Sequence, residues 1–206
     1  MSVITSISPQ RNGKRINIYL DGKFGFGIDL KNFVKLGLKV ERRLSDEELK
    51  TILFKSSSQK YFDGSLLFIS LRPRSIKEVS DWCVRKKLSK DDSLKLIDKL
   101  KKMKLLDDES FAKWWIGQRI SFKNKSKKEL VSELRHKGID RKFIDGVLED
   151  LPVDDEKNAR QLLLKNSYKW KNYPRKTALQ KMYGYLLRKG FNWEVVKKVT
   201  NSFLDI

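Results

Sequence analysis

The chain has 206 residues, of which 39% are hydrophobic and 35% are charged. That length allows one or two domains with real cores, and the high charged fraction favours an elongated arrangement over one large globule. With 46 basic and 26 acidic residues the net charge is +20, which indicates a polyanionic partner: nucleic acid, or a protein that carries it. A lysine-rich surface that only reflects a biased proteome is the plainer alternative.

Cysteine content and hydropathy indicate the cellular compartment that we expect for the protein. The single cysteine, Cys83, excludes an intramolecular disulfide framework and fits a reducing compartment. The first ten residues have no apolar signal region, and no apolar run approaches the ~20 residues that a membrane span needs. We therefore expect a cytoplasmic, soluble protein without membrane contact, and we expect it to be a monomer.

The first 30 residues predict a three-stranded antiparallel β meander. Apolar residues alternate with polar ones over 15–20 and 24–28, and a β-branched stretch covers 3–7. Asn12-Gly13 and Asp21-Gly22 separate these runs, and such pairs suit tight hairpin turns because both central positions need positive φ. The glycines of 22–27 do not have phosphate-loop spacing, so we interpret them as close packing between strands.

A helical region follows the meander. Asp29 can cap a short helix that runs to Leu36 and ends at Gly37, and residues 38–44 form a connector. A capping box at Ser45-Asp46-Glu47-Glu48 begins the next helix. Three serines at 56–58 indicate a kink or a loop, after which a further helix runs to Leu71 and stops before Pro73.

From residue 60 onward the pattern is helical and repeats. At an offset of 51 residues, the capping box Ser75-x-x-Glu78 matches Ser126-x-x-Glu129, and the core positions Val79 and Cys83 match Leu130 and Leu134. A third copy follows at an offset of 52, where the matches to 130, 134 and 137–139 are Met182, Leu186 and Lys189-Gly190-Phe191. Periods of this size indicate stacked helical units that bury their apolar faces together.

The fold class is therefore mainly α: tandem three-helix repeats in an elongated, curved array, preceded by a small N-terminal β meander. The expected helices of the three units are 60–71, 75–87 and 89–103; then 107–122, 126–137 and 140–150; then 154–168, 176–189 and 192–205. The expected boundaries are 1–44 for the β-rich region with its short helix, 45–59 for a connecting helix, and 60–106, 107–152 and 153–206 for the repeats.

The residues that usually carry chemistry are scarce. The only histidine, His136, lies at a helix end beside Arg135 and Lys137, where it complements the helix C-terminus. One histidine and one cysteine cannot assemble a zinc or haem site of the usual kind, and Cys83 occupies a core position of the repeat. Most acids begin helices and are explained as caps; a two-carboxylate metal site is the remaining alternative. We expect no enzyme activity, no metal and no cofactor.

Basic residues crowd the turn between the first and second helix of every unit. If the units stack with similar geometry, these turns form a discontinuous basic stripe that neutralises phosphates; the alternative is that each cluster is a solvated turn. The aromatic loop 166–174 between lysines adds candidates for stacking or for anchoring a protein partner. The candidate partner- or DNA-binding residues are Arg72, Arg74, Arg119, Lys123, Lys125, Lys127, Lys128, Arg135, Lys171, Arg175, Lys176, Arg188, Trp170 and Tyr173.

Over about residues 60–206 the pattern resembles the RecX family, bacterial regulators of the RecA recombinase. The residues that carry the resemblance are the segments Arg72-Pro73-Arg74-Ser75 with Glu78, Leu105-Leu106-Asp107-Asp108-Glu109-Ser110-Phe111-Ala112 with Arg119, Glu133-Leu134-Arg135-His136-Lys137-Gly138-Ile139 and Tyr185-Leu186-Leu187-Arg188-Lys189-Gly190-Phe191. The N-terminus resembles the β-rich extension of some members more weakly. Lys87 departs from the pattern in place of a glycine, and Lys181 in place of a glutamate.

The resemblance implies a protein that binds the RecA filament on single- or double-stranded DNA, either directly or through the filament. Members are expected to lie in the filament groove and to inhibit ATP hydrolysis, strand exchange and the coprotease function, which places them in homologous recombination, DNA repair and the SOS response. The main alternative is a stand-alone nucleic-acid-binding helical module. A nuclease or another enzyme is a more distant one.

Overall fold

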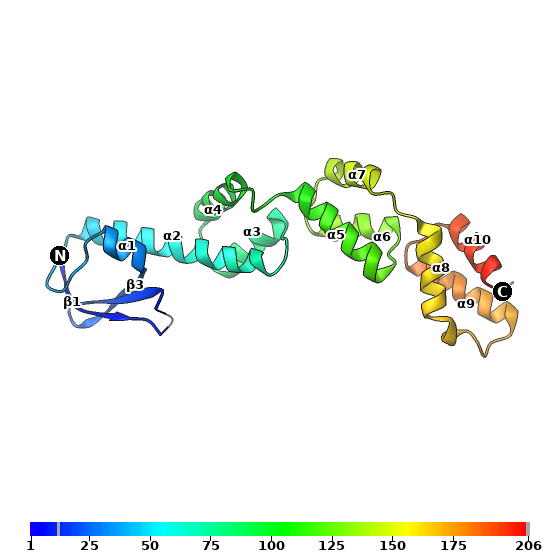
Figure 1. Cartoon of the computed structure of the whole chain (residues 1–206), viewed down its shortest axis with the longest axis horizontal. Helices are drawn as coiled ribbons and strands as arrows, with labels where there is room; N and C mark the ends of the chain where they lie inside the picture. Colours follow the sequence, from blue (N-terminus) through cyan, green and yellow to red (C-terminus); the bar gives the residue numbers. More distant parts are fainter. Residues whose placement is uncertain (12, 205–206) are drawn as a thin grey trace. The chain divides into compact units, whose positions relative to one another are not determined.

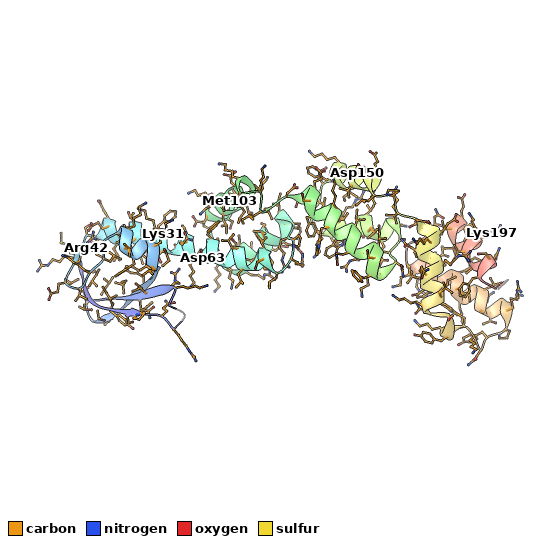
Figure 2. The ribbon with its side chains drawn as sticks, viewed as in Figure 1. Lys31, Arg42, Asp63, Met103, Asp150 and Lys197 are labelled. Atoms are coloured by element: carbon orange, nitrogen blue, oxygen red, sulfur yellow. The ribbon has the colours of Figure 1, made fainter. Side chains whose placement is uncertain are left out.

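The computed structural model describes residues 1–11 and 13–204 and divides into two compact units, Met1–Arg72 and Pro73–Ile206 (Figure 1). The first unit contains all of the β-strands that the described residues form, and the second is helical. Charged side chains project from the ribbon, as Lys31 and Lys197 do in Figure 2. Among the described residues, no helix is both long and apolar enough to cross a membrane.

The sheet of the first unit contains the predicted meander and one strand more. β1 (Ser2–Pro9), β2 (Arg15–Leu20) and β3 (Lys23–Asp29) pair antiparallel, and β4 (Arg43–Leu44) adds to the edge of β1, giving the order β3-β2-β1-β4. The prediction that 38–44 is only a connector is therefore wrong. A strand of two residues is too short to show an alternating pattern, and only its pairing with β1 creates it.

The turn chemistry of this sheet follows the sequence. Asp21 and Gly22 have φ values of 50° and 80°, as the predicted tight hairpin turn requires. Gly13 also has a positive φ, while its partner in the other predicted turn, Asn12, lies outside the described residues. The predicted close packing is confirmed, because a Cβ on Gly25 would stand 2.8 Å from Cγ of Leu20.

Two helices complete the first unit. α1 (Leu30–Lys35) is capped by Asp29, whose carboxylate accepts the Asn32 N–H, and Gly37 follows it with a φ of 57°. α2 (Asp46–Ser70) begins with the predicted capping box of Ser45 and Glu48. α2 runs without interruption through the serines at 56–58, so the prediction of two helices with a break there is wrong.

The sheet explains why the serines do not end α2. Ser56 is buried, and its hydroxyl donates a hydrogen bond to the Gly27 carbonyl of β3. Ser57 bonds back to the Phe54 carbonyl of its own helix at 2.9 Å. The serine hydroxyls are thus satisfied without breaking the helix. The expected boundary between 59 and 60 falls inside this helix, whereas the compact units divide after Arg72.

Among the described residues, the second unit contains the eight predicted helices that follow α2, and one of them ends earlier than predicted. The helix expected over 154–168 stops at Lys165 and is followed by a 3-10 turn. The elements are α3 (Ile76–Arg85), α4 (Lys90–Lys102), α5 (Asp108–Lys123), α6 (Lys127–His136), α7 (Arg141–Asp150), α8 (Asp155–Lys165), the 3-10 helix η1 (Ser167–Lys169), α9 (Arg175–Arg188) and α10 (Trp193–Leu204).

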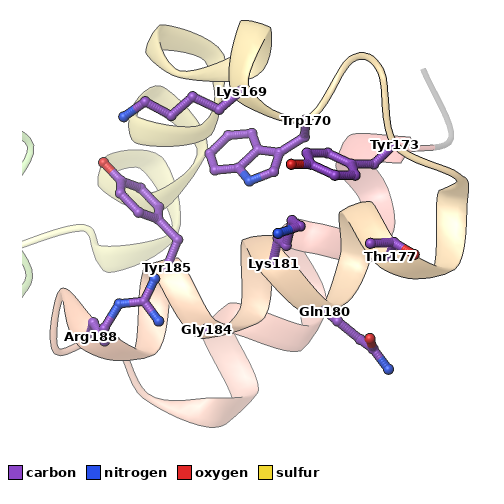
Figure 3. Close-up of a pocket in the computed structure, with 9 residues that line it drawn as sticks. All are labelled: Lys169, Trp170, Tyr173, Thr177, Gln180, Lys181, Gly184, Tyr185 and Arg188. Atoms are coloured by element: carbon purple, nitrogen blue, oxygen red, sulfur yellow. The ribbon is translucent and has the colours of Figure 1, made fainter.

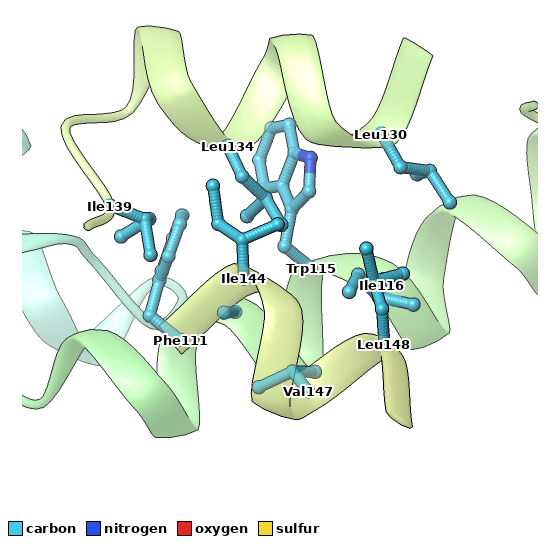
Figure 4. Close-up of a cluster of buried hydrophobic side chains, with 10 residues drawn as sticks. Phe111, Trp115, Ile116, Leu130, Leu134, Ile139, Ile144, Val147 and Leu148 are labelled. Atoms are coloured by element: carbon cyan, nitrogen blue, oxygen red, sulfur yellow. The ribbon is translucent and has the colours of Figure 1, made fainter. Parts of the chain in front are cut away.

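Burial confirms the register of the repeat. The three residues matched at the first core position, Val79, Leu130 and Met182, are 0%, 0% and 2% exposed. Those matched at the second position are fully buried as well, and they include Cys83 as predicted. α5, α6 and α7 enclose one such core, in which Phe111 and Trp115 of α5 face Leu134 and Ile144 (Figure 4).

Successive three-helix repeats within the second unit are joined by one repeated set of hydrogen bonds, which we call the joint. The hydroxyl of Ser75, the cap of α3, donates to the Lys137 carbonyl at the end of α6 at 2.7 Å, while a carboxylate oxygen of Asp108 accepts the Ile76 N–H at 2.9 Å. The next joint repeats both bonds: Ser126 to the Lys189 carbonyl at 2.7 Å, and the Lys127 N–H to Asp155 at 2.8 Å. The capping serine therefore also fixes the position of the following repeat.

Candidate binding surface

The basic turn of the second repeat lies between α5 and α6. Asn124 adopts the left-handed conformation with a φ of 48°, which redirects the chain after α5, and Ser126 caps α6. Three predicted candidates around this turn, Lys123, Lys127 and Lys128, are exposed. Their ammonium groups are therefore available to a partner.

Two other candidates at the same turn are committed to an internal ion cluster. Glu133 of α6 accepts hydrogen bonds from Arg119 at 2.9 Å and from the Trp115 indole N–H at 2.8 Å, and Nζ of Lys125 lies 3.2 Å from its other oxygen. The Arg119 guanidinium also lies 4.1 Å from the centre of the Trp115 ring, and Lys125 additionally pairs with Glu129. The cluster ties α5 to α6.

The electrostatics of Glu133 match this structural role. Burial alone would raise the pKa of its carboxyl group, but the hydrogen bonds from Trp115, Lys125 and Arg119 outweigh burial and hold the pKa below its ordinary value. Arg119 and Lys125 thus compensate charge inside the protein. The sequence pattern assigns these two residues to a basic binding stripe, but their pairing with Glu133 gives them a structural role. The sequence pattern could not reveal that pairing.

The charged candidates of the first turn, between α2 and α3, are less exposed than the lysines of the second turn. Arg72 and Arg74 are both half-buried. Arg74 lines a hollow of about 530 Å³ together with Lys101, Lys104 and Leu105. The arginine therefore belongs to a partly apolar depression in the second compact unit rather than to an open basic turn.

The third turn changes the interpretation of one aromatic candidate. Trp170, a candidate for stacking or for anchoring a protein partner, is 6% exposed and packs in the core of α8, α9 and α10, so little of its ring is available to a partner. Trp170 follows η1 directly, and its indole lies against Tyr185 with the ring centres 5.5 Å apart. Tyr173 remains 46% exposed, and Lys171, Arg175 and Lys176 are exposed.

Trp170 and Tyr173 line two hollows that bring several candidates together. A hollow of about 460 Å³ is also lined by Lys171 and Arg175, among others. The larger hollow, of about 640 Å³, we call the α9 groove (Figure 3); it is lined by Lys169, Trp170, Tyr173, Thr177, Gln180, Lys181, Gly184, Tyr185 and Arg188. Lys176 lines neither hollow, and Arg135 lies exposed on α6 in the second repeat.

Sequence reasoning missed two cations of the α9 groove, Lys169 and Lys181. A signal for the groove was present in the sequence, because Thr177, Lys181, Gly184 and Arg188 are spaced by four, three and four residues. That spacing places them along one face of a helix. In the sequence, Lys181 is recognised only as a lysine at a repeat position where the first two units have glutamate.

Metal-ligating residues do not gather in the part of the chain that the structure describes: no group of three or more His, Cys, Asp or Glu side chains could hold an ion there. His136 is exposed, and its Nδ1 lies 2.8 Å from the Ser132 carbonyl one turn earlier. That contact fixes the ring against its own helix.

Family models match three parts of the chain. The model described as the regulatory protein RecX N-terminal domain matches residues 2–45, that of the second RecX three-helix domain matches 107–148, and that of the third matches 154–200.

Curated relatives match along nearly the whole length. "Regulatory protein RecX" of Bacillus pumilus (strain SAFR-032) is 32% identical over 207 residues, covering 100% of this chain and 79% of the relative. The protein of the same name from Bacillus subtilis (strain 168) is 34% identical over 202 residues, covering 95% and 75%. A solved structure, "Crystal structure of regulatory protein RecX", shares the fold with a TM-score of 0.69 at 24% identity, covering 98% of this chain and all of that one.

Proposed function

Because the chain belongs to the RecX family of regulatory proteins, we propose that it binds the filament that the RecA recombinase forms on DNA and restrains it. Binding along the filament groove would inhibit ATP hydrolysis, strand exchange and the coprotease function. Inhibition of this kind needs contacts but no catalytic group, so it is compatible with the binding geometry of the described residues.

The observation that carries the proposal is the repeated joint. The Ser75–Lys137 and Ser126–Lys189 hydrogen bonds couple each repeat to the next through the same atoms. Repeats coupled in this way offer one continuous surface that can contact several subunits of a filament at once. Independent repeats on flexible linkers would each lose freedom on binding, which costs affinity.

Exposed charge supports a contact with a partner that carries DNA. Lys123, Lys127 and Lys128 lie around one joint, and the chain as a whole has a net charge of +20. Cations on such a surface are attracted to phosphates, and the attraction falls as salt rises. We place the first contact with the filament at this turn.

A titration of RecA ATPase activity on single-stranded DNA tests the proposal. We expect inhibition at fewer copies of this protein than of RecA, because one chain spans more than one subunit. Direct DNA binding should be measured in parallel at rising salt. Tight binding to DNA with no effect on ATP hydrolysis by a formed filament would refute the proposal and favour the alternative, a stand-alone nucleic-acid-binding module.

A further inference from the structure

The α9 groove combines aromatic rings and cations in one hollow of about 640 Å³. It is bounded by the end of η1 and the loop after it on one side and by α9 on the other (Figure 3). Six lining residues determine its character: Trp170, Tyr173, Tyr185, Lys169, Lys181 and Arg188. All of them belong to the third repeat, so the groove is complete within one three-helix core.

Three rings form one wall of the groove. Tyr185 meets Trp170 edge-on with centres 5.5 Å apart and an interplanar angle of 62°, and Figure 3 shows Tyr173 on the other side of the indole. The buried indole holds its neighbours in place, while Tyr173 is 46% exposed and Tyr185 is half-buried. The tyrosines can therefore present ring surface to a ligand.

The charged groups of the groove are all cationic. Nζ of Lys181 lies 4.6 Å from the centre of the Tyr173 ring, and Nζ of Lys169 lies 5.6 Å from that of Tyr185. Arg188 completes the set at the end of α9, and none of the residues that line the groove is an aspartate or a glutamate. An anionic ligand that also has planar faces fits this lining.

We infer that the α9 groove binds single-stranded nucleic acid, with bases stacked on Tyr173 and Tyr185 and phosphates paired with Lys169, Lys181 and Arg188. Unpaired bases expose flat faces that stack on aromatic side chains in a sequence-tolerant way, while cations follow the backbone. A duplex keeps its base faces stacked internally, and an acidic peptide has no comparable faces for the tyrosines. The inference rests on the proposed function for its setting, a filament assembled on DNA.

Gly184 provides a sharp test because it lies in the groove on α9. A Cβ built there meets only the flexible end of Arg188, with Nη1 at 3.3 Å, so a larger side chain can enter without disturbing the core. Gly184→Leu should fill the groove and also favour the helix, since glycine is a poor helix former. Gly146→Leu on α7 is the matched control, because a Cβ on Gly146 meets nothing within 4 Å.

The assay is fluorescence anisotropy of the whole chain with labelled oligo-dT, in the absence of any recombinase. Because each variant removes or blocks a surface on which bases stack, we expect Gly184→Leu and Tyr173→Ala each to weaken binding about tenfold. Gly146→Leu should bind as the unaltered chain does. An abasic oligonucleotide of equal length should bind the unaltered chain about tenfold more weakly than oligo-dT, and this difference should be smaller for Tyr173→Ala, which keeps only Tyr185 as a stacking ring.

Unchanged oligo-dT binding by Gly184→Leu and Tyr173→Ala would overturn the inference. So would equal losses for duplex DNA, or competition by polyglutamate as effective as that by unlabelled oligo-dT. RecA ATPase inhibition is measured separately with the same proteins. Lack of inhibition by a chain that still binds oligo-dT through the groove would refute the proposed function while supporting the groove, so the two failures are distinguishable.

Discussion

The hydroxyl of Ser126 donates a hydrogen bond of 2.7 Å to the main-chain carbonyl of Lys189, 63 residues later in the chain. The same oxygen accepts the Glu129 N–H at 3.2 Å, as an N-cap does. One side chain thus caps the first turn of a helix and joins two repeats. The equivalent pair, Ser75 and Lys137, repeats this at the preceding joint with the same distance. The joint therefore belongs to the repeat itself.

Replacing Ser126 with alanine removes both functions of the hydroxyl. The loss of the cap costs about 1 kcal/mol, and the Lys189 carbonyl left without its partner adds about 1–2 kcal/mol to the loss. Ser89→Ala is the control, since Ser89 caps α4 by accepting the Asp92 N–H without a bond to another repeat. Urea denaturation should show the larger loss for Ser126→Ala. Equal losses would mean that the joint adds no stability.

Lys87 occupies the position where the other repeats have Gly138 and Gly190. Its φ is 59°, in the left-handed region that the two glycines share at 79° and 81°. A lysine there carries strain that glycine avoids, so Lys87→Gly should stabilise the protein by about 0.5–1 kcal/mol. Lys86→Gly is the control, because Lys86 has a φ of −83° and should lose stability. Thermal denaturation measures both, and a lower melting temperature for Lys87→Gly would contradict this account.

The Glu133 cluster predicts a stability that depends on pH in one direction. Because its folded-state pKa is lowered, the carboxylate contributes stability above the unfolded pKa of about 4.3, and this is lost as pH falls through the folded value. Glu133→Gln should therefore cost about 1–2 kcal/mol at pH 7. The difference from the unaltered protein should shrink below about pH 4. If the difference in stability between the two proteins stays constant down to pH 3, the charge of Glu133 is not its cause.

For Asp155 we predict a pH dependence of stability with the opposite sign to that of Glu133. Burial raises the pKa of its carboxyl group and outweighs the hydrogen bond from the Lys127 N–H, so the ionised form is disfavoured in the folded state. Asp155→Asn keeps an acceptor oxygen and removes the charge, so it should be at least as stable as the original at pH 7. Its advantage should vanish as pH falls through the raised pKa.

Asp155→Ala separates the acceptor from the charge. It leaves the Lys127 N–H without its partner and should lose about 1 kcal/mol at every pH. Denaturation curves between pH 3 and 7 measure the three proteins together. If the unaltered protein is more stable than Asp155→Asn at pH 7, the predicted sign of the pH dependence is wrong.

The exposed lysines of the second turn predict a loss of function without a loss of fold. Reversing Lys123, Lys127 and Lys128 to glutamate should weaken inhibition of the RecA ATPase at least about tenfold and reduce its salt dependence. The control reverses Lys31, Lys39 and Lys50, exposed in the first compact unit, and changes the net charge by the same amount. Lys125 is left unaltered because it pairs with Glu129 and Glu133. If both triple variants inhibit the RecA ATPase equally, the second turn does not contact the filament as proposed.

The three-stranded meander and the repeat registers could be predicted because their signals can be read directly along the chain. Asp21-Gly22 requires a turn wherever it lies, and the periods of 51 and 52 residues place core positions by themselves. The break expected at the serines 56–58 was wrong for the complementary reason. A serine ends or continues a helix according to whether its hydroxyl finds another partner, and for Ser56 that partner is the Gly27 carbonyl in a distant strand.

The sequence by itself determined the class of this protein: a basic, helical, repeated chain with few residues suited to catalysis. Only the tertiary structure decided which cations are available. Arg119 and Lys125 look like Lys123 and Lys127 along the chain, but Glu133 lies beside the first pair alone. Charge is a property of composition, whereas its compensation depends on groups that folding brings within a few ångströms, and these lie 14 and 8 residues away.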